Sequence, residues 1–174
     1  FLCFGRRHVL NFEPRHWPHV LPVGLPKLDA LAEQPTSDGG FILFLAQTSP
    51  APPILRGLLL DLQREAGLPV RIRRHPAHPE LFDALGDAFE FTADAQDPVL
   101  QMAECTWMLT THSTAALEAI MLHKPVVVMP SFGTADFPGY PALATDFTAD
   151  KVLGALARAR KGGAAIERFL LDNC

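Results

Sequence analysis

Short stretches of apolar and β-branched residues recur along the chain, each bounded by residues that favour a turn. The clearest, residues 41–46, has no polar side chain and follows the turn signal Asp38-Gly39-Gly40. An uninterrupted apolar run of this length is typical of a strand buried on both faces of a parallel sheet. The pattern predicts strands at 19–23, 41–46, 69–73, 88–91, 107–110 and 125–129.

The segments between these strands show apolar residues at helical spacing and recognisable helix ends. One apolar stripe ends before Gly67, a common helix stop, and consists of Ile54, Leu55, Leu58, Leu59 and Leu62. Asp97 before Pro98 is a favoured helix start, and Thr148 is expected to cap a later helix. We expect helices over 50–66, 79–85, 114–122, 148–161 and 166–171, and one that begins at 97–98.

Strands and helices that alternate at this spacing predict right-handed βαβ units. The expected fold class is therefore α/β, a Rossmann-like three-layer domain with a parallel sheet. In such sheets ligands bind beyond the carboxyl ends of the strands, so the loops after the strands are the candidates for function. We expect residues 20–174 to form this domain and residues 1–19 to be an irregular lead-in or linker from an N-terminal domain outside the sequence.

Composition narrows the class of protein. The 174 residues are 48% hydrophobic and 20% charged, which indicates a folded globular chain. The net charge of −4 argues against a nucleic-acid partner, because such binding needs a basic face. No apolar run approaches the roughly 20 residues of a membrane-spanning helix. Cys3, Cys105 and Cys174 have no CxxC spacing, which favours reduced thiols in a cytoplasmic location.

The loop after the predicted strand 69–73 carries a cluster of cations. Arg71 and Arg73 alternate onto one face of the strand, and Arg74 and His75 follow at its end. Pro76 restricts His75 to an extended backbone. Arginine and histidine gathered at a carboxyl edge suit a phosphate group. A solvated charge cluster with a helix-capping histidine explains the same residues equally well.

The loop after the predicted strand 107–110 carries hydroxyl groups and a histidine. Thr110, Thr111, His112, Ser113 and Thr114 come directly before a helix. Ser113 or Thr114 can cap that helix, and the open N–H groups of a helix start favour an anion. The alternative is an ordinary capping box with Glu118, although the spacing from Thr114 is one residue longer than that motif prefers.

Several other signals are absent or weak. The chain has no GxGxxG, no GxxxxGK[ST] and no GxSxG, which argues against a dinucleotide fingerprint, a P-loop and a hydrolase nucleophile. The pairs His16/His19 and His75/His78 have metal-like spacing but lack nearby acidic or thiol ligands, so no metal site is expected. Trp17 lies in an apolar context, as does Trp107, and we expect both to be packing residues.

Four short segments resemble a group of bacterial enzymes. They are Gly24-Leu25-Pro26-Lys27-Leu28-Asp29, Arg74-His75-Pro76, Ser113-Thr114-Ala115-Ala116-Leu117-Glu118-Ala119 and Lys124-Pro125-Val126-Val127-Val128. Over roughly residues 20–160 the chain resembles the C-terminal half of surface-polysaccharide transferases: capsule polysaccharide synthesis proteins, including Kdo transferases, and CDP-glycerol glycerophosphotransferases. Two departures are His112, at a position where no single residue is expected, and His123, where the family commonly has glycine.

The resemblance implies a GT-B architecture, in which two Rossmann-like domains face a cleft and the C-terminal one holds the nucleotide. By this likeness the donor or its phosphate would contact Arg74, His75, His112, Ser113, Thr114 and Glu118, with Glu118 at the ribose or base. The cleft would be lined by Gln47, Thr48 and Ser49. It further implies a cytidine-nucleotide donor, a CMP-sugar or CDP-glycerol, and no metal cofactor. His75 would stabilise negative charge on the leaving phosphate.

The resemblance therefore implies the donor-binding domain of a glycosyltransferase or glycerophosphotransferase in bacterial surface polysaccharide biosynthesis. The acceptor would be a polysaccharide or a lipid-linked molecule, and the general base would come from the N-terminal domain of the same full-length protein. The fragment is expected to be inactive alone. The expected location is cytoplasmic, with association at the inner face of the membrane left open. Two alternatives remain open: a domain like that of UDP-GlcNAc 2-epimerase, and a non-catalytic binding domain.

Overall fold

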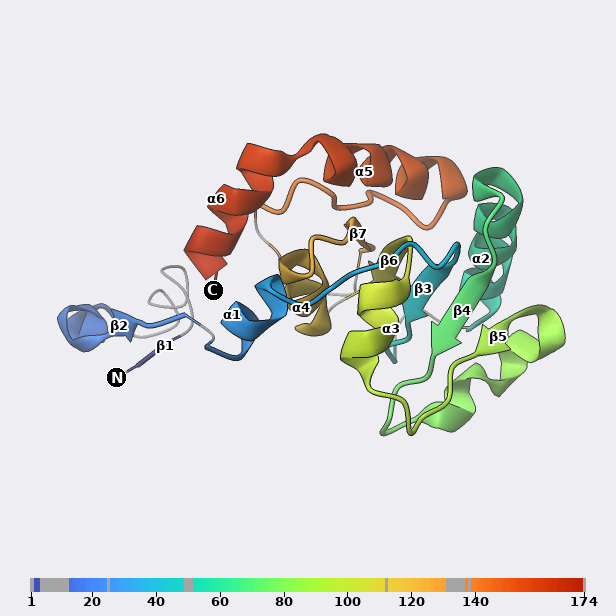
Figure 1. Cartoon of the computed structure of the whole chain (residues 1–174), viewed down its shortest axis with the longest axis horizontal. Helices are drawn as coiled ribbons and strands as arrows, with labels where there is room; N and C mark the ends of the chain where they lie inside the picture. The colour runs from blue at the N-terminus through green and yellow to red at the C-terminus, as the bar shows by residue number, and fades with distance from the viewer. Residues whose placement is uncertain are drawn as a thin grey trace.

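A five-stranded parallel sheet forms the centre of the molecule (Figure 1). The computed structural model describes residues 2–3, 13–24, 26–48, 52–111, 113–130, 137 and 139–173. Its strand order is β5-β4-β3-β6-β7, and every neighbouring pair is parallel. The strands are β3 (Ile42–Leu45), β4 (Val70–Arg73), β5 (Glu90–Phe91), β6 (Trp107–Thr110) and β7 (Val126–Val128). The predicted parallel sheet is confirmed.

Helices cover both faces of this sheet, so the three-layer α/β prediction is also confirmed. One face packs against α2 (Pro52–Ala66), the 3-10 helix η3 (Pro79–Ala88) and α5 (Ala149–Lys161). The other packs against α1 (Pro26–Ala32), α3 (Pro98–Glu104), α4 (Ala115–Met121) and α6 (Gly163–Asn173). None of the helices within the described residues is long and apolar enough to cross a membrane.

The central strand β3 shows why the apolar run at 41–46 has no polar position. Ile42 and Phe44 pack into the core on the α2 side. Leu43 and Leu45 pack into the core on the α4 side. All four side chains are buried. Since both faces of β3 are covered by helices, a polar side chain at any of these positions would lose its water without gaining a partner.

Helix α2 follows its predicted stripe with one exception. Its buried side chains are Leu55, Leu58, Leu59 and Leu62. Ile54 is 51% exposed, so the expectation that it belongs to the buried stripe is wrong. Ile54 lies in the first turn at the edge of the apolar stripe, where the helix no longer faces the sheet. Gly67 ends the helix with φ 65°, the left-handed conformation that favours glycine.

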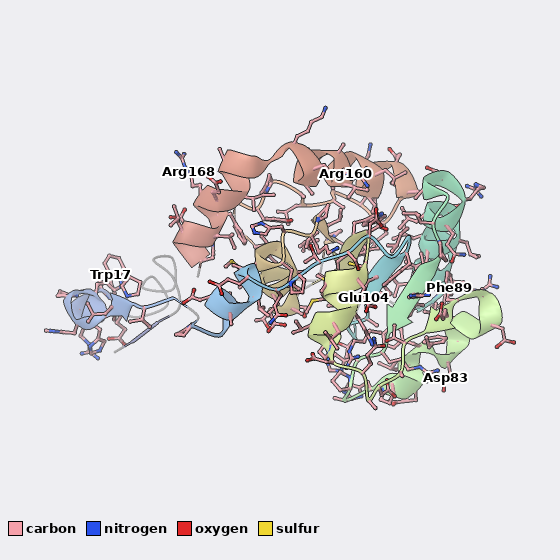
Figure 2. The ribbon with its side chains drawn as sticks, viewed as in Figure 1. Trp17, Asp83, Phe89, Glu104, Arg160 and Arg168 are labelled. Atoms are coloured by element: carbon pink, nitrogen blue, oxygen red, sulfur yellow. The ribbon has the colours of Figure 1, made fainter. Side chains whose placement is uncertain are left out.

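Only one of the two tryptophans packs as expected. Trp107 of β6 is fully buried, whereas Trp17 is 41% exposed, so that expectation is confirmed for Trp107 and wrong for Trp17. Trp17 lies in the 3-10 helix η2 (Pro14–His19), which precedes β2 (Leu21–Pro22). Strand β2 pairs with β1 (Leu2–Cys3) in a separate two-stranded sheet, which lies beyond α1 and away from the central sheet (Figure 1). Figure 2 shows Trp17 apart from the helices of the central sheet, and among the described residues no helix layer covers it as helices cover Trp107.

The two predicted helix caps have different outcomes. Asp97 caps α3 as expected, because its Oδ1 accepts a 2.9 Å hydrogen bond from the backbone N–H of Val99. Thr148 precedes α5, but its side chain makes no capping bond. Its hydroxyl donates to Oδ1 of Asp150 at 2.7 Å. The hydroxyl bond also lowers the pKa of Asp150.

The amino ends of the strands are closed by hydrogen bonds from side chains. The Lys124 ammonium group donates to the carbonyl oxygens of Ser37 and Cys105. The Thr106 hydroxyl donates to the Asp38 carboxylate, which lowers the pKa of Asp38. Burial raises the pKa of the Cys105 thiol to about 12. These bonds join the segment before β3 to the start of β6.

His123 lies in the turn between α4 and β7 with φ 57°. A side chain is disfavoured in this left-handed conformation and glycine is not. The conformation gives a physical reason for the glycine that is common at this position in the transferases that the sequence resembles.

Candidate functional site

The strand order identifies one point on the carboxyl edge as the candidate site. After β3 the chain moves to β4 and β5, and after β6 it moves the other way to β7. Neighbouring strands whose connections diverge define a topological switch point, here between β3 and β6, and open α/β sheets bind ligands there. The loop after β3 begins with Gln47 and Thr48, and the loop after β6 contains Ser113. The structure thus brings these two predicted site segments to adjacent strand ends.

Hydrogen bonds tie the strand ends together directly beneath these loops. The buried Thr110 hydroxyl donates to the carbonyl oxygen of Leu45 at 3.2 Å, which joins the ends of β6 and β3. On the other side, the N–H of Ala46 donates to the carbonyl of Arg73 at 2.9 Å. The N–H of Met129 donates to the carbonyl of Thr110 at 2.8 Å. The ends of β4, β3, β6 and β7 therefore hold fixed positions relative to one another.

Ser113 is the residue that caps the helix after β6. Its hydroxyl oxygen accepts a 3.3 Å bond from the N–H of Ala115, and its carbonyl accepts one from Ala116 at 2.9 Å. Thr114 is exposed and its side chain makes no capping bond, so of the two alternatives the cap is Ser113. Glu118 is half-buried in the first turn of α4. One hydroxyl is thus used for capping, and the Thr114 hydroxyl is left at the surface.

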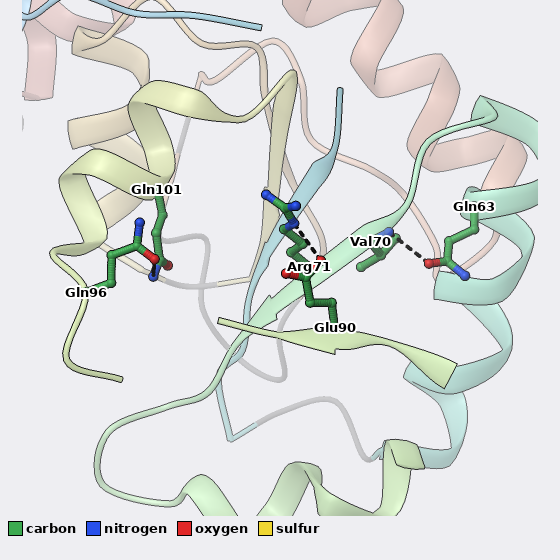
Figure 3. Close-up of polar contacts among 6 residues, drawn as sticks. All are labelled: Gln63, Val70, Arg71, Glu90, Gln96 and Gln101. Carbon is green, nitrogen blue, oxygen red and sulfur yellow. Dashed lines mark hydrogen bonds and ion pairs between the residues drawn. The ribbon is translucent and has the colours of Figure 1, made fainter. Parts of the chain in front are cut away.

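The arginines at the end of β4 are engaged within the domain. Arg71 donates to Glu90 Oε2 at 2.8 Å (Figure 3) and lies 4.3 Å from the ring centre of Phe41. Arg73 donates to the carbonyl oxygen of Gln96 at 2.8 Å. As predicted, both side chains lie on the face of β4 opposite Val70 and Ile72. These contacts hold β5 and the loop after it against β4.

Arg74 is also engaged within the domain. Its Nη2 donates to Asp83 Oδ1 at 3.0 Å, and its guanidinium lies 4.2 Å from the ring centre of Phe91. Its Nε is buried and has no hydrogen-bond partner among the described residues. Arg74 therefore supplies positive charge from a fixed position at the edge.

His75 has a geometry that suits an anion. Its Nδ1 accepts a 3.2 Å hydrogen bond from the N–H of Ala77. A neutral imidazole that accepts at Nδ1 carries its proton on Nε2, so Nε2 is a donor. The ring is half-buried and stacks on His78, with ring centres 5.9 Å apart and 19° between planes. Because strands lie about 4.8 Å apart, the ends of β4 and β6 are separated by roughly 10 Å, a span that a nucleotide covers.

Not every predicted site residue can be placed. Ser49 and His112 lie outside the described residues. Gln47 is half-buried and Thr48 is exposed. Within the described ranges, no three His, Cys, Asp or Glu side chains come together as a metal-binding group.

Two polar residues at this edge, Gln96 and Gln101, carried no signal of a site role in the sequence. Gln96 lies in the loop after β5, Gln101 is buried in α3, and Arg73 binds the Gln96 carbonyl. The single sequence feature that marks Gln101 is a polar residue next to two apolar ones, Met102 and Ala103, in a short helix. That feature alone does not distinguish a site residue from a surface residue.

Comparison with known proteins bears on the fold. No family model and no curated protein matches the chain. An Escherichia coli heptosyltransferase, WaaC, solved with ADP-2-deoxy-2-fluoro heptose, matches 75% of this chain with a TM-score of 0.54 and 15% identity. A Methanocaldococcus jannaschii UDP-GlcNAc 2-epimerase, solved with UDP-GlcNAc and UDP, matches 85% with a TM-score of 0.57 and 14% identity. The chain has a GT-B-type Rossmann-like fold.

The matches cover 47% of the heptosyltransferase and 49% of the epimerase, so the chain spans about half the length of each. The fold is that of one of the two Rossmann-like halves of such proteins. It is shared by a nucleotide-sugar transferase and a nucleotide-sugar epimerase, and at this identity it does not separate the two activities.

Proposed function

We propose that the chain is the donor-binding domain of a transferase that uses a nucleotide-activated sugar or glycerol, with a cytidine nucleotide as the donor. The observation that carries the proposal is the pair of loops after β4 and β6, which flank β3 at the carboxyl edge of the sheet. Ser113 lies after β6, and His75 lies after β4, on the two sides of β3. This arrangement offers a hydroxyl and an imidazole N–H to one bound nucleotide.

The chemistry of these groups fits the departure of a nucleotide. When the sugar–phosphate bond of a CMP-sugar breaks, or the phosphoanhydride bond of CDP-glycerol, negative charge develops on the phosphate of the leaving CMP. Donors aimed at that charge stabilise the transition state. His75 would donate from Nε2, and Ser113 and Thr114 would donate from their hydroxyls. Arg74 and His112 would add positive charge or a further donor, and Glu118 would accept from the ribose hydroxyls or the base.

The remaining parts of the reaction would lie outside this chain. In the proposed enzyme an N-terminal domain supplies the general base and binds a polysaccharide or lipid-linked acceptor, so the fragment alone is expected to be inactive. Gln47, Thr48 and Ser49 would line the cleft between the domains. The reaction would need no metal ion. Surface polysaccharide synthesis would place the whole protein in the cytoplasm, at the inner face of the membrane.

Ligand titration tests the proposal. CMP, CDP and UDP are titrated against the chain, with binding followed by calorimetry or NMR. We expect cytidine nucleotides to bind best. Absence of binding by all three at millimolar concentration would overturn the proposal.

Single substitutions test the phosphate assignment. His75→Ala and Ser113→Ala should each weaken CMP about tenfold and leave the weaker binding of cytidine unchanged, since only CMP carries the phosphate. His123→Ala, at the opposite edge of the sheet, is the matched control and should change neither affinity. Equal losses for CMP and cytidine would contradict the phosphate assignment.

An epimerase-like domain is the second candidate, because half of a solved UDP-GlcNAc 2-epimerase has the same fold. The segment Ser113-Thr114-Ala115 disfavours it, since the epimerases have Ser-Gly-Gly in the resembling position. A clear preference for UDP over CDP in the same titration would favour the epimerase.

A further inference from the structure

Gln101 is a buried polar residue whose presence the fold does not require. Its side chain is 2% exposed, in a helix whose next two residues are buried and apolar. Its Nε2 donates to Gln96 Oε1 at 3.1 Å, and its own Oε1 has no hydrogen-bond partner among the described residues. A buried carbonyl without a partner destabilises the folded state, whereas an apolar side chain of the same size would not.

The effect of Gln101 is to hold Gln96 in one orientation. Three bonds converge on Gln96: Gln101 donates to its side-chain oxygen, Arg73 donates to its carbonyl at 2.8 Å, and its own N–H donates to the carbonyl of Ala93 at 3.1 Å. Asp97, the next residue, is fixed by capping α3. Both the backbone and the amide plane of Gln96 are therefore set before any ligand binds.

The bonds from Gln101 and Arg73 to Gln96 lie at the carboxyl edge, next to the candidate site. Arg73 is the last residue of β4, and its carbonyl accepts from Ala46, directly before Gln47. Figure 3 shows the Gln96–Gln101 pair on one side of β4 and a third glutamine, Gln63, on the other. Gln63 Oε1 accepts from the N–H of Val70, the first residue of β4, at 2.8 Å. Gln63 therefore binds the first residue of β4, and Gln96 binds the side chain of its last residue, Arg73.

The bond from Gln101 fixes the oxygen of the Gln96 amide and leaves its NH2, which is a donor only, to be offered to a ligand. Gln96 is exposed, so a ligand at the edge can reach it. The two N–H groups of the Gln96 amide favour a base that places a hydrogen-bond acceptor beside them, such as the C2 carbonyl of a pyrimidine. A site built to donate to that carbonyl discriminates against a base that lacks it.

We infer that Gln96 determines base specificity by donating to the carbonyl of a pyrimidine, and that Gln101 and Arg73 are positioning residues for its amide. The inference rests on the proposed function, since it places the base of the same donor at the loop after β5 and its phosphate between His75 and Ser113. It explains why α3 retains a buried amide whose oxygen has no partner among the described residues.

The experiment compares ligands that differ in the base. CMP, AMP and ribose 5-phosphate are titrated against the wild-type chain and against Gln96→Ala. The substitution should weaken CMP about tenfold, the effect of one lost hydrogen bond, and leave ribose 5-phosphate unchanged. The ratio of CMP to AMP affinity should fall by a similar factor.

Gln101→Met tests the positioning role with a readout that a purely structural role would not give. Met has nearly the same shape and removes the buried carbonyl, so the melting temperature should stay the same or rise, while CMP binding weakens several-fold. Gln63→Met is the matched control: it should lower the melting temperature, because it leaves the Val70 N–H unpaired, and leave the CMP to AMP ratio unchanged.

The outcomes separate this inference from the function on which it rests. Binding of CMP by the wild type with an unchanged CMP to AMP ratio in Gln96→Ala overturns the inference and leaves the proposed function standing. Equal losses of CMP and ribose 5-phosphate overturn it as well, because they place Gln96 at the phosphate or in the fold. Failure of the wild type to bind either nucleotide overturns both.

Discussion

The two ends of the central sheet use the same kinds of side chain for different purposes. At the amino edge, Lys124, Thr106 and Gln63 each bind a neighbouring segment of the chain. At the carboxyl edge, the hydroxyl of Thr114 and the imidazole Nε2 of His75 are directed away from helix capping and local pairing. The amino edge is closed by its polar groups, and the carboxyl edge has polar groups that the proposed function assigns to a ligand.

The difference teaches where substitutions should affect stability and where they should affect binding. A side chain that satisfies a backbone carbonyl in the folded state leaves that carbonyl unpaired when it is removed. A surface side chain that makes no capping bond, such as that of Thr114, leaves no backbone group unpaired when it is removed. Stability is therefore expected to depend on the amino edge, and ligand affinity on the carboxyl edge. The arginines of β4 lie at the carboxyl edge but are paired within the domain, so they belong to the first group.

The largest effect on stability is expected for Lys124→Met at the amino edge. The substitution removes charge-assisted bonds to two carbonyls, from Ser37 and Cys105, and should lower the free energy of unfolding by about 2–3 kcal/mol. Denaturant unfolding measures the change. Lys161→Met, at an exposed position at the end of α5, is the control and should change stability by less than about 0.5 kcal/mol. Equal effects of the two substitutions would remove the distinction between the edges.

A smaller effect is expected for Thr110→Val, which tests the one buried hydroxyl bond that joins β6 to β3. Loss of the bond to the Leu45 carbonyl should lower the free energy of unfolding by about 1–2 kcal/mol. Thr106→Val removes an exposed hydroxyl bond to Asp38 and should have a smaller effect. If Thr106→Val were the more destabilising of the two in urea unfolding, burial of the hydroxyl would not decide how much each hydrogen bond contributes to stability.

Ser113→Ala should lower stability by about 0.5–1 kcal/mol, the usual effect of losing a helix cap. Thr114→Ala is its control, because the Thr114 side chain makes no capping bond and its removal should leave the melting temperature unchanged. Thermal unfolding without ligand separates the two. A larger loss for Thr114→Ala would mean that Thr114, and not Ser113, is the cap.

His123→Gly is expected to stabilise the protein by about 0.5–1 kcal/mol. Glycine removes the steric cost of φ 57°, and part of that gain is offset by the greater freedom of glycine in the unfolded chain. His123→Ala keeps the side-chain carbon that causes the strain and should not stabilise. A lower melting temperature for His123→Gly would show that the imidazole makes a favourable contact.

The smallest effect on the free energy of unfolding at neutral pH is expected for Cys105. This residue should change stability at alkaline pH. Burial raises the pKa of this thiol to about 12, so the folded state holds its proton more tightly than the unfolded chain, whose thiol pKa is about 8.5. Its contribution is complete below about pH 8.5 and is lost as the pH rises toward 12. Cys105→Ala should flatten this part of the stability profile, measured by urea unfolding between pH 8 and 10.5. An unchanged profile would contradict the assignment.

Much of the fold could be predicted because its signals are local. The run at 41–46 became β3, buried on both faces, and Asp97 before Pro98 became a capped helix start. The predictions that failed depend on what lies beside a residue. Ile54 and Trp17 are apolar but largely exposed, and Thr148 makes no capping bond.

Less of the candidate site could be predicted. The sequence placed His75 and Ser113 after strands, which is correct, but it could not show that Arg71, Arg73 and Arg74 are paired within the domain. Their partners are up to 23 residues away along the chain. Gln96 and Gln101 were overlooked because nothing in a linear pattern marks an amide that is buried without a partner for its oxygen.

The sequence by itself determined the alternation of strands and helices, the burial of the central strand and the loops in which the site should be sought. These follow from hydrophobic periodicity and from turn and capping residues, which act over a few neighbouring positions. The tertiary structure decided the strand order, which puts the loops after β3 and β6 side by side, and it decided which cations are paired. Those choices depend on contacts between segments far apart in the chain, where packing and desolvation outweigh local preference.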